Sequence, residues 1–139
     1  PEWKTFAVPT LENNAPNAPL TYPVDLTEAI KNGVQNNTRL LLNPNPDQAE
    51  VTIEGKVLSY SVMPVALQEG DNAAKNRLTI SVNFTIFITK PEESEMKMSA
   101  SRFIDFDSSQ DLASIEGQLL QDINEQIVQD VINKLLSNW

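Results

Sequence analysis

The sequence predicts an α+β fold, a single two-layer sandwich in which two helices cover one face of a mainly antiparallel sheet of four to five strands. Three observations lead to this prediction. Residues 78–89 alternate apolar and polar side chains, as a strand with one buried face does. Two other segments, 25–37 and 109–139, carry apolar residues at helical spacing. Short turns join the strands between them, which favours hairpins and the order β-α-β-β-β-β-α.

The N-terminal part is expected to hold one strand and the first helix. Residues 2–8 are predicted to form a strand, and the Pro- and Asn-rich stretch 9–23 should have no regular structure. Asp25 followed three residues later by Glu28 has the form of a capping box, which predicts that the helix begins there. The helix should end at the Asn pair 36–37.

The middle of the chain reads as paired strands. A short strand is expected at 39–42 and a long one at 49–67, where the apolar positions change phase near Val57 and Leu58. That change predicts a β-bulge or a strong bend. A polar loop at 68–76 precedes the regular strand, and the returning strand should cover 95–106.

The last segment predicts one long helix with Ser108 or Ser109 as its cap and Asp111 in its first turn. Its apolar residues drift slowly around the helix axis. One interpretation is that the helix crosses a twisted sheet and packs on the first helix. The other is that its far end, with Trp139, offers apolar residues to a partner.

Composition narrows the class of protein. The chain of 139 residues fits one domain, residues 1–139, and has neither Cys nor His. Thiol chemistry and Cys/His metal sites are thereby excluded. The net charge of −9, with ten basic residues scattered singly, argues against nucleic acid as a partner. We expect no catalytic residues, no cofactor and no metal, and hence a protein that is not an enzyme.

Two acidic groups are considered and set aside. Asp105 and Asp107 alternate at a strand end, but a carboxylate pair acting in catalysis needs a cleft and a group that shifts one pKa. We interpret them as turn formers. Glu92, Glu93 and Glu95 surround a turn without the spaced Asp/Gly loop of a calcium site.

The better candidate for function is the polar face of the predicted sheet. Hydroxyl-bearing and amide side chains should lie together there, opposite the helices, and partner-binding residues are predicted at Ser81, Thr85, Ser99 and Lys56. The polar loop adds Lys75 and Arg77, the place where an anionic ligand would be least repelled by an acidic chain. The alternative is an ordinary solvated face.

The order of these segments resembles the LptE family of lipopolysaccharide-assembly lipoproteins, in particular the form found in Bacteroidetes. The resemblance covers nearly the whole chain, and no single motif carries it alone. The matching segments are Trp3-Lys4-Thr5-Phe6, Tyr22-Pro23, Thr38-Arg39-Leu40, Glu50 to Gly55, Asn76-Arg77-Leu78-Thr79-Ile80, Arg102-Phe103-Ile104-Asp105-Phe106-Asp107 and Asn138-Trp139.

The resemblance implies an outer-membrane lipoprotein on the periplasmic side that inserts into the LptD β-barrel and helps to assemble it. The family is thought to receive lipopolysaccharide there. In this acidic chain, lipopolysaccharide binding is expected at Lys75 and Arg77, where the lipid phosphates would be least repelled. The family's tether is a lipidated N-terminal Cys. Because the chain begins at Pro1 and has no Cys, we expect a signal peptide and lipid-attachment segment to have been removed.

Two other classes of function stay open at this stage. A periplasmic glycan- or lipid-binding module would need a concave site with clustered aromatic side chains, and the aromatic residues here are dispersed. A small hydrolase would need a nucleophile with a base, and without His or Cys only carboxylate chemistry is left.

Overall fold

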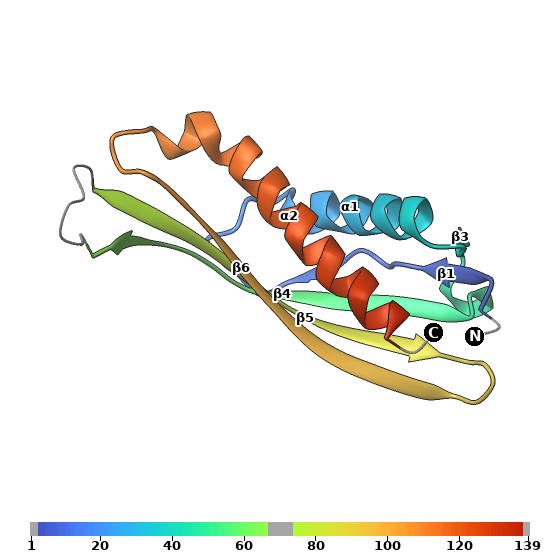
Figure 1. Ribbon diagram of the computed structural model, residues 1–139. Coiled ribbons are helices and arrows are strands. Elements are labelled where there is room, and N and C mark those ends of the chain that lie inside the picture. Colours follow the sequence, from blue (N-terminus) through green and yellow to red (C-terminus); the bar gives the residue numbers. More distant parts are fainter. Residues whose placement is uncertain (1–2, 67–73, 138–139) are drawn as a thin grey trace.

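The computed structural model describes residues 3–66 and 74–137, in which two helices lie on one face of a twisted sheet (Figure 1). This confirms the predicted α+β fold with both helices on one side. The elements in chain order are β1 (Thr5–Ala7), β2 (Glu12–Asn13), α1 (Tyr22–Asn37), β3 (Leu41–Leu42), a short 3-10 helix (Pro46–Gln48), β4 (Val51–Val65), β5 (Lys75–Ile88), β6 (Ser94–Asp107) and α2 (Leu112–Leu136).

The sheet is mixed rather than mainly antiparallel, and its described part contains six strands instead of the predicted four to five. The strand order is β3-β1-β4-β5-β6, and β2 also pairs with β4. The three long strands are antiparallel, whereas β1 and β2 run parallel to β4, and β1 runs parallel to β3. Strands β1 and β3 lie within the predicted strands 2–8 and 39–42. Strand β2 has only two residues, too few to show a periodicity, and it lies in the stretch 9–23 that was expected to have no regular structure.

The predicted bulge in β4 is confirmed. The pairing of β4 with β5 shifts register between Val57 and Ser59, which leaves Leu58 as the extra residue. Val57 is buried on the helix side, and after the bulge Tyr60 is buried on that same side. The bulge thus explains the change of phase in the sequence, because it returns the apolar residues to the core.

The hairpin of β5 and β6 has an unbroken register from Lys75 opposite Asp107 to Ile88 opposite Ser94. Strand β5 begins three residues before the predicted start, so Lys75 and Arg77 belong to a strand and not to the loop. Strand β6 places Ala100 in the core and Met96 and Met98 against it, which confirms the predicted face. Residues 68–73 of the predicted loop, and residue 67 at the predicted end of the preceding strand, lie outside the described residues.

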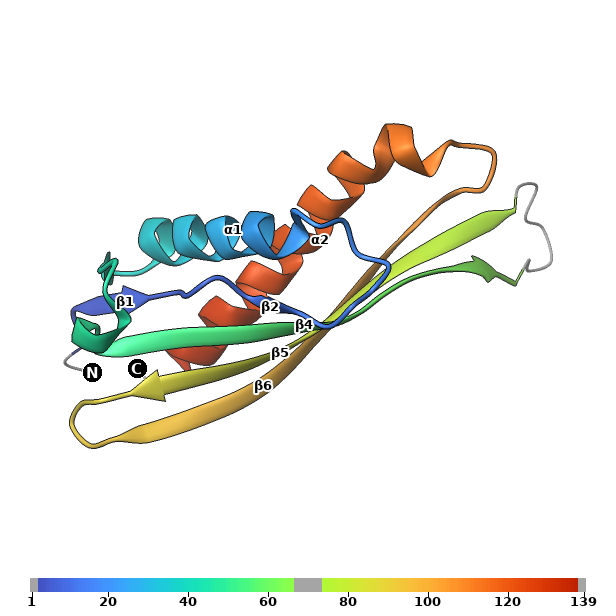
Figure 2. The same ribbon diagram turned by 180° about the vertical axis from the view of Figure 1, so that it is seen from behind.

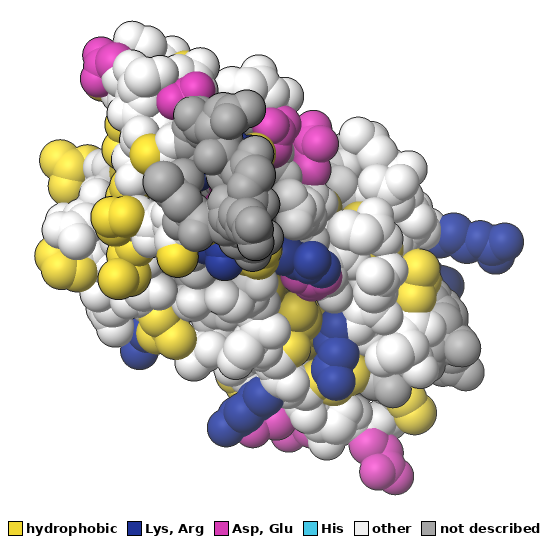
Figure 3. Space-filling view, turned by 60° about the vertical axis from the view of Figure 1, so that its left-hand side comes forward, with side chains coloured by type: hydrophobic (Ala, Val, Ile, Leu, Met, Phe, Trp, Pro, Cys, Tyr) yellow, Lys and Arg dark blue, Asp and Glu magenta, His cyan; other side chains and the backbone are white. Residues whose placement is uncertain are grey.

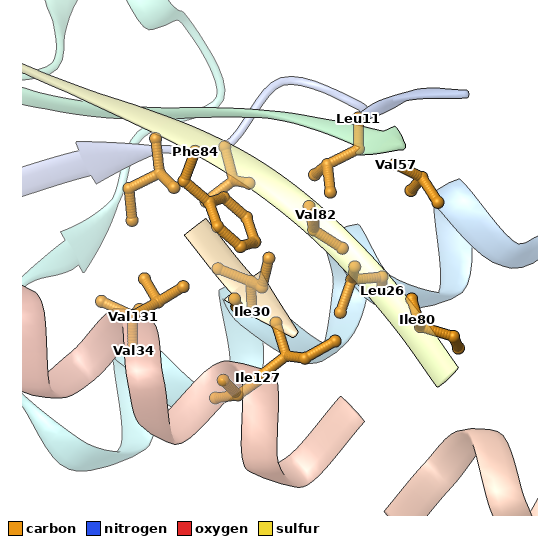
Figure 4. Close-up of a cluster of buried hydrophobic side chains, with 14 of the residues drawn as sticks. Leu11, Leu26, Ile30, Val34, Val57, Ile80, Val82, Phe84, Ile127 and Val131 are labelled. Atoms are coloured by element: carbon orange, nitrogen blue, oxygen red, sulfur yellow. The ribbon is translucent and has the colours of Figure 1, made fainter. Parts of the chain in front are cut away.

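The core fills the space between the sheet and both helices. Figure 4 shows Phe84 of β5 among Ile30 and Val34 of α1 and Ile127 and Val131 of α2. All five of these side chains are at most 1% exposed. Figures 1 and 2 show α2 crossing the sheet obliquely beside α1, which explains its drifting apolar stripe. The interpretation that α2 spans a twisted sheet and packs on α1 is confirmed, while Trp139 lies outside the described residues.

Both predicted helix starts are wrong. Helix α1 begins at Tyr22 with Pro23 in its first turn, a position where proline's fixed φ suits a helix and its missing N–H costs nothing. Asp25 therefore lies inside the first turn instead of capping it. Helix α2 is capped by Asp111, whose Oδ1 accepts a hydrogen bond from the N–H of Ala113. Ser109 instead donates to Asp107.

Candidate interaction surface

The side of β4, β5 and β6 that faces away from the helices forms a polar surface, here called the open face. The register of the three strands sets its members, and none of them is buried. They are Thr52, Glu54, Lys56, Ser59, Ser61, Met63, Val65, Lys75, Arg77, Thr79, Ser81, Asn83, Thr85, Phe87, Glu95, Lys97, Ser99, Ser101, Phe103, Asp105 and Asp107. This confirms the predicted clustering of hydroxyl-bearing residues on one face of the sheet.

The four residues predicted to bind a partner lie in neighbouring cross-strand rows of the open face. Lys56 and Ser99 flank Asn83, Thr85 lies in the next row along β5, and Ser81 lies in the row on the other side. The Ser99 hydroxyl donates to Asn83 Oδ1 over 2.7 Å. Cross-strand hydrogen bonds of this kind hold the hydroxyl groups in fixed positions.

The open face is hollowed at these rows, with a volume of about 810 Å³. Lys56, Thr85 and Ser99 line the hollow, and Ser81 does not. Its wall on the β4 side comes from residues 9–12. The other lining residues are Pro9, Thr10, Glu12, Glu54, Gly55, Asn83, Phe84, Lys97 and Met98.

The wall is held in place by a close approach of the chain to Gly55. Leu11 is buried, and a Cβ atom on Gly55 would lie 2.9 Å from its side chain, so any larger residue at position 55 would displace Leu11. The N–H of Leu11 donates to Thr27 Oγ1 of α1 over 3.0 Å. Beside it, Glu12 Oε2 lies 3.6 Å from Lys56 Nζ. This wall was missed because it is more than forty residues away in sequence from the strands that it borders.

Lys75 and Arg77 lie on the open face but away from the hollow. Arg77 is six residues before Asn83, roughly 20 Å along an extended strand. Its guanidinium donates to both carboxylate oxygens of Asp105, over 2.7 and 3.1 Å, and stacks 4.0 Å from the ring centre of Phe103. Lys75 lies opposite Asp107 in the register. Neither cation is isolated from carboxylates, so the positive patch predicted here is largely compensated.

The acidic side chains at this end have lowered pKa values. The hydrogen bond from Arg77 holds the pKa of Asp105 below its ordinary value, and the backbone hydrogen bond from Ser109 does the same for Asp107. Asp107 is thus the turn former that the sequence predicted. Asp105 is instead a strand residue in an ion pair. Both carboxylates are held in their charged form.

The open face also exposes aromatic side chains that the sequence prediction did not select. Phe87 is 38% exposed and Phe103 is 51% exposed. The signal for both was available, since each continues the alternation that identified Thr85 and Ser101. Figure 3, which looks toward the β4–β5 end of the molecule, shows basic side chains spread among uncharged, hydrophobic and acidic ones. The face offers polar, aromatic and charged contacts together.

Within residues 3–66 and 74–137, no group of three or more acidic side chains is placed to hold a metal ion, and the glutamates around the β5–β6 turn form no such group. Neither α1 nor α2 is long and apolar enough to cross a membrane.

The family of this chain follows from its match to a known family model. A family model named LptE, described as lipopolysaccharide-assembly, matches residues 3–135. The chain belongs to the LptE family. No curated protein shows significant similarity to it.

Solved structures of bacterial lipoproteins share the fold of this LptE-family chain. The minor lipoprotein from Acinetobacter baumannii has a TM-score of 0.57 at 16% identity and covers 98% of this chain and 94% of its own. Lipoprotein B from Nitrosomonas europaea has a TM-score of 0.60 at 18% identity, with 96% and 82% covered. The rare lipoprotein B from Shewanella oneidensis has 0.55 at 18% identity, with 95% of each chain covered. At these identities the likeness shows the fold alone.

Proposed function

We propose that this LptE-family protein is a non-enzymatic assembly factor of the outer membrane. In this proposal it forms a single domain over residues 1–139, anchored by a lipid on the periplasmic side. It plugs an LptD-like β-barrel, helps the barrel to assemble, and so supports lipopolysaccharide transport to the outer leaflet. The family match over residues 3–135 is the main support.

The observation that carries the plug role is the chemistry of the open face. Large outer-membrane barrels have a polar lumen, because their apolar side chains face the lipid. A protein that fits inside one therefore needs a broad polar surface. The open face spans three strands, carries serines, threonines and Asn83, and is left uncovered by α1 and α2 (Figure 2). Its exposed Phe87 and Phe103 add the aromatic contacts that are common in interfaces.

Co-expression tests this proposal. The protein with its native leader should co-purify in detergent with the LptD-like barrel of the same genome. The variant Ser81→Arg with Ser99→Arg adds two bulky charges in adjacent rows of the open face and should abolish the complex. The control Gln121→Arg with Gln129→Arg adds the same groups to exposed positions of α2 and should leave it intact. Equal loss in both variants would contradict the open face as the contact.

A second candidate is direct lipopolysaccharide handling at Lys75 and Arg77. One observation favours it: these two cations share the end of the open face with Phe103 and with Met63, which is 64% exposed. Cations suit the phosphates of lipopolysaccharide, and exposed apolar side chains suit its acyl chains. The compensation by Asp105 and Asp107 weighs against strong binding.

Charge reversal tests the second candidate. Lys75→Glu with Arg77→Glu should weaken binding to purified lipopolysaccharide, while Lys56→Glu with Lys97→Glu in the hollow should not. If the hollow variant lost binding instead, the hollow would be the site. That result would favour the alternative of a glycan- or lipid-binding module.

A further inference from the structure

The outer edge of β6 is a long strand edge without the usual protection against pairing. Strand β6 is the last in the sheet order, and Figures 1 and 2 both show it at the margin. Among the described residues, no backbone hydrogen bond other than those to β5 reaches Met98–Phe106. Over this stretch the sequence has no Pro, no Gly and no bulge. An edge of this kind is a template for another strand.

The remaining sheet edges are protected. Strand β3 is two residues long and is followed by Pro44 and Pro46. The free half of β4 contains the bulge at Leu58 and Pro64, two devices that prevent strand addition. The other edges of the sheet are thus protected against strand addition, and the Met98–Phe106 edge is the exception.

The charges near the edge do not repel an incoming strand. Lysine protects strand edges, but Lys97 lies just before the stretch. Within it, Arg102 is held by Asp130 of α2 through hydrogen bonds of 2.5 and 2.9 Å, and Asp105 is held by Arg77. An occupant of this edge therefore needs no particular charge.

The side chains along the edge define what an added strand should contain. On the helix side, Met98 and Ile104 are only partly buried against the core, because the sheet ends at β6. On the open side, Ser99 and Ser101 are exposed. An added strand with alternating apolar and uncharged polar residues would cover Met98 and Ile104 with its apolar side chains. Its polar side chains would lie beside the hydroxyl groups of Ser99 and Ser101.

A second copy of this chain is a less suitable occupant of the edge than a single extended segment. Of the sheet's strands, α2 packs chiefly on β6. A two-fold axis joining two β6 edges would place both helix layers on the same side. Because packed helices need about 8 to 10 Å between their axes, the two copies of α2 would crowd each other where they lie above the joined edges. An occupant that brings no helix of its own avoids this crowding.

We propose that the outer edge of β6, from Met98 to Phe106, is a second interaction surface, which binds one extended segment of a partner protein by strand addition. The segment is uncharged, with apolar residues facing α2 and hydroxyl or amide residues facing the open side. This mode takes affinity from main-chain hydrogen bonds and specificity from alternate side chains. It differs from the plug contact, which uses the face of the sheet and not its edge.

A synthetic peptide with the sequence of residues 78–86, which carries no charged side chain, provides the probe. This part of β5 already pairs with the inner edge of β6 and has the required alternation. The control peptide carries proline at the positions of Ile80 and Val82, which removes two backbone donors. Binding to the full chain is mapped by amide NMR shifts and hydrogen exchange. We expect the first peptide to shift and protect amides within Met98–Phe106, and the control to do neither.

Two protein variants locate the contact. Ser99→Lys with Ser101→Lys protects the edge with exposed lysines and should abolish peptide binding. Ser59→Lys with Ser61→Lys makes the same change on β4 and should leave binding unchanged. The proposal is overturned if no binding occurs at millimolar peptide, if the affected amides lie on β4, or if the protein self-associates through β6 in analytical ultracentrifugation.

Discussion

The hydroxyl of Tyr22 in α1 donates a 2.7 Å hydrogen bond to Asn124 Oδ1 in α2. Tyr22 is fully buried and Asn124 is 8% exposed, so this bond joins the helices inside the core. Tyr22→Phe would leave the amide of Asn124 without its partner. We expect it to lower the free energy of unfolding by about 1 to 3 kcal/mol, measured in urea. The double variant Tyr22→Phe with Asn124→Leu should recover part of the lost free energy of unfolding. No recovery would mean that the packing of Tyr22, and not the hydrogen bond, stabilises the helix pair.

The same helix pair meets closely at Gly33. A Cβ atom there would lie 2.2 Å from Val128 Cγ1, and the branched side chain of valine turns with difficulty in a helix. Gly33→Ala should therefore destabilise the protein by about 1 to 3 kcal/mol, despite the better helix propensity of alanine. Adding Val128→Ala should relieve the clash.

Gly117 provides a matched control in α2. A Cβ atom there would meet nothing within 4 Å, so Gly117→Ala should stabilise the protein by up to about 1 kcal/mol. If both alanine substitutions changed the melting temperature in the same direction, the close helix contact at Gly33 would be refuted.

Phe84 and Phe87 test the orientation of the sheet. They lie on opposite faces of β5, with Phe84 1% exposed and Phe87 38% exposed. Phe84→Ala should cost about 3 to 5 kcal/mol. Phe87→Ala should change stability much less, as measured by chemical denaturation. Similar losses for the two would show that the open face is covered.

The alternation around Phe84 shows how much the sequence could predict. The period-two pattern predicted which residues of β5 and β6 face the core, and the change of phase predicted the bulge at Leu58. Both features depend only on which neighbouring residues are buried. The strand β2, the parallel pairing of β1 and β2 with β4, and the wall of the hollow depend on contacts across the chain that no local pattern encodes. Of the candidate site, the open face was predicted, but the compensation of Arg77 by Asp105 was not, since it depends on the strand register.

The Arg77–Asp105 pair predicts an acid dependence of stability. Because the folded state lowers the pKa of Asp105 from 3.8, the ionised carboxylate stabilises the fold above that pH, and the contribution is lost as the pH falls through the lowered value. Asp105→Asn should therefore lower the melting temperature at neutral pH, and the difference from the wild type should shrink as the pH falls below 3.8. A difference that stayed constant with pH would show that the charge of Asp105 contributes nothing.

Site-specific photo-crosslinking in cells tests the central proposal most directly. A photo-reactive residue is placed singly at Lys56, Ser81, Thr85 or Ser99 on the open face, and at Gln121, Glu125 or Gln129 on α2 as controls. If the open face fits inside an LptD-like barrel, the first set should crosslink to the barrel protein and the controls should not. Crosslinks to the barrel from α2 alone, with none from the open face, would contradict the proposal.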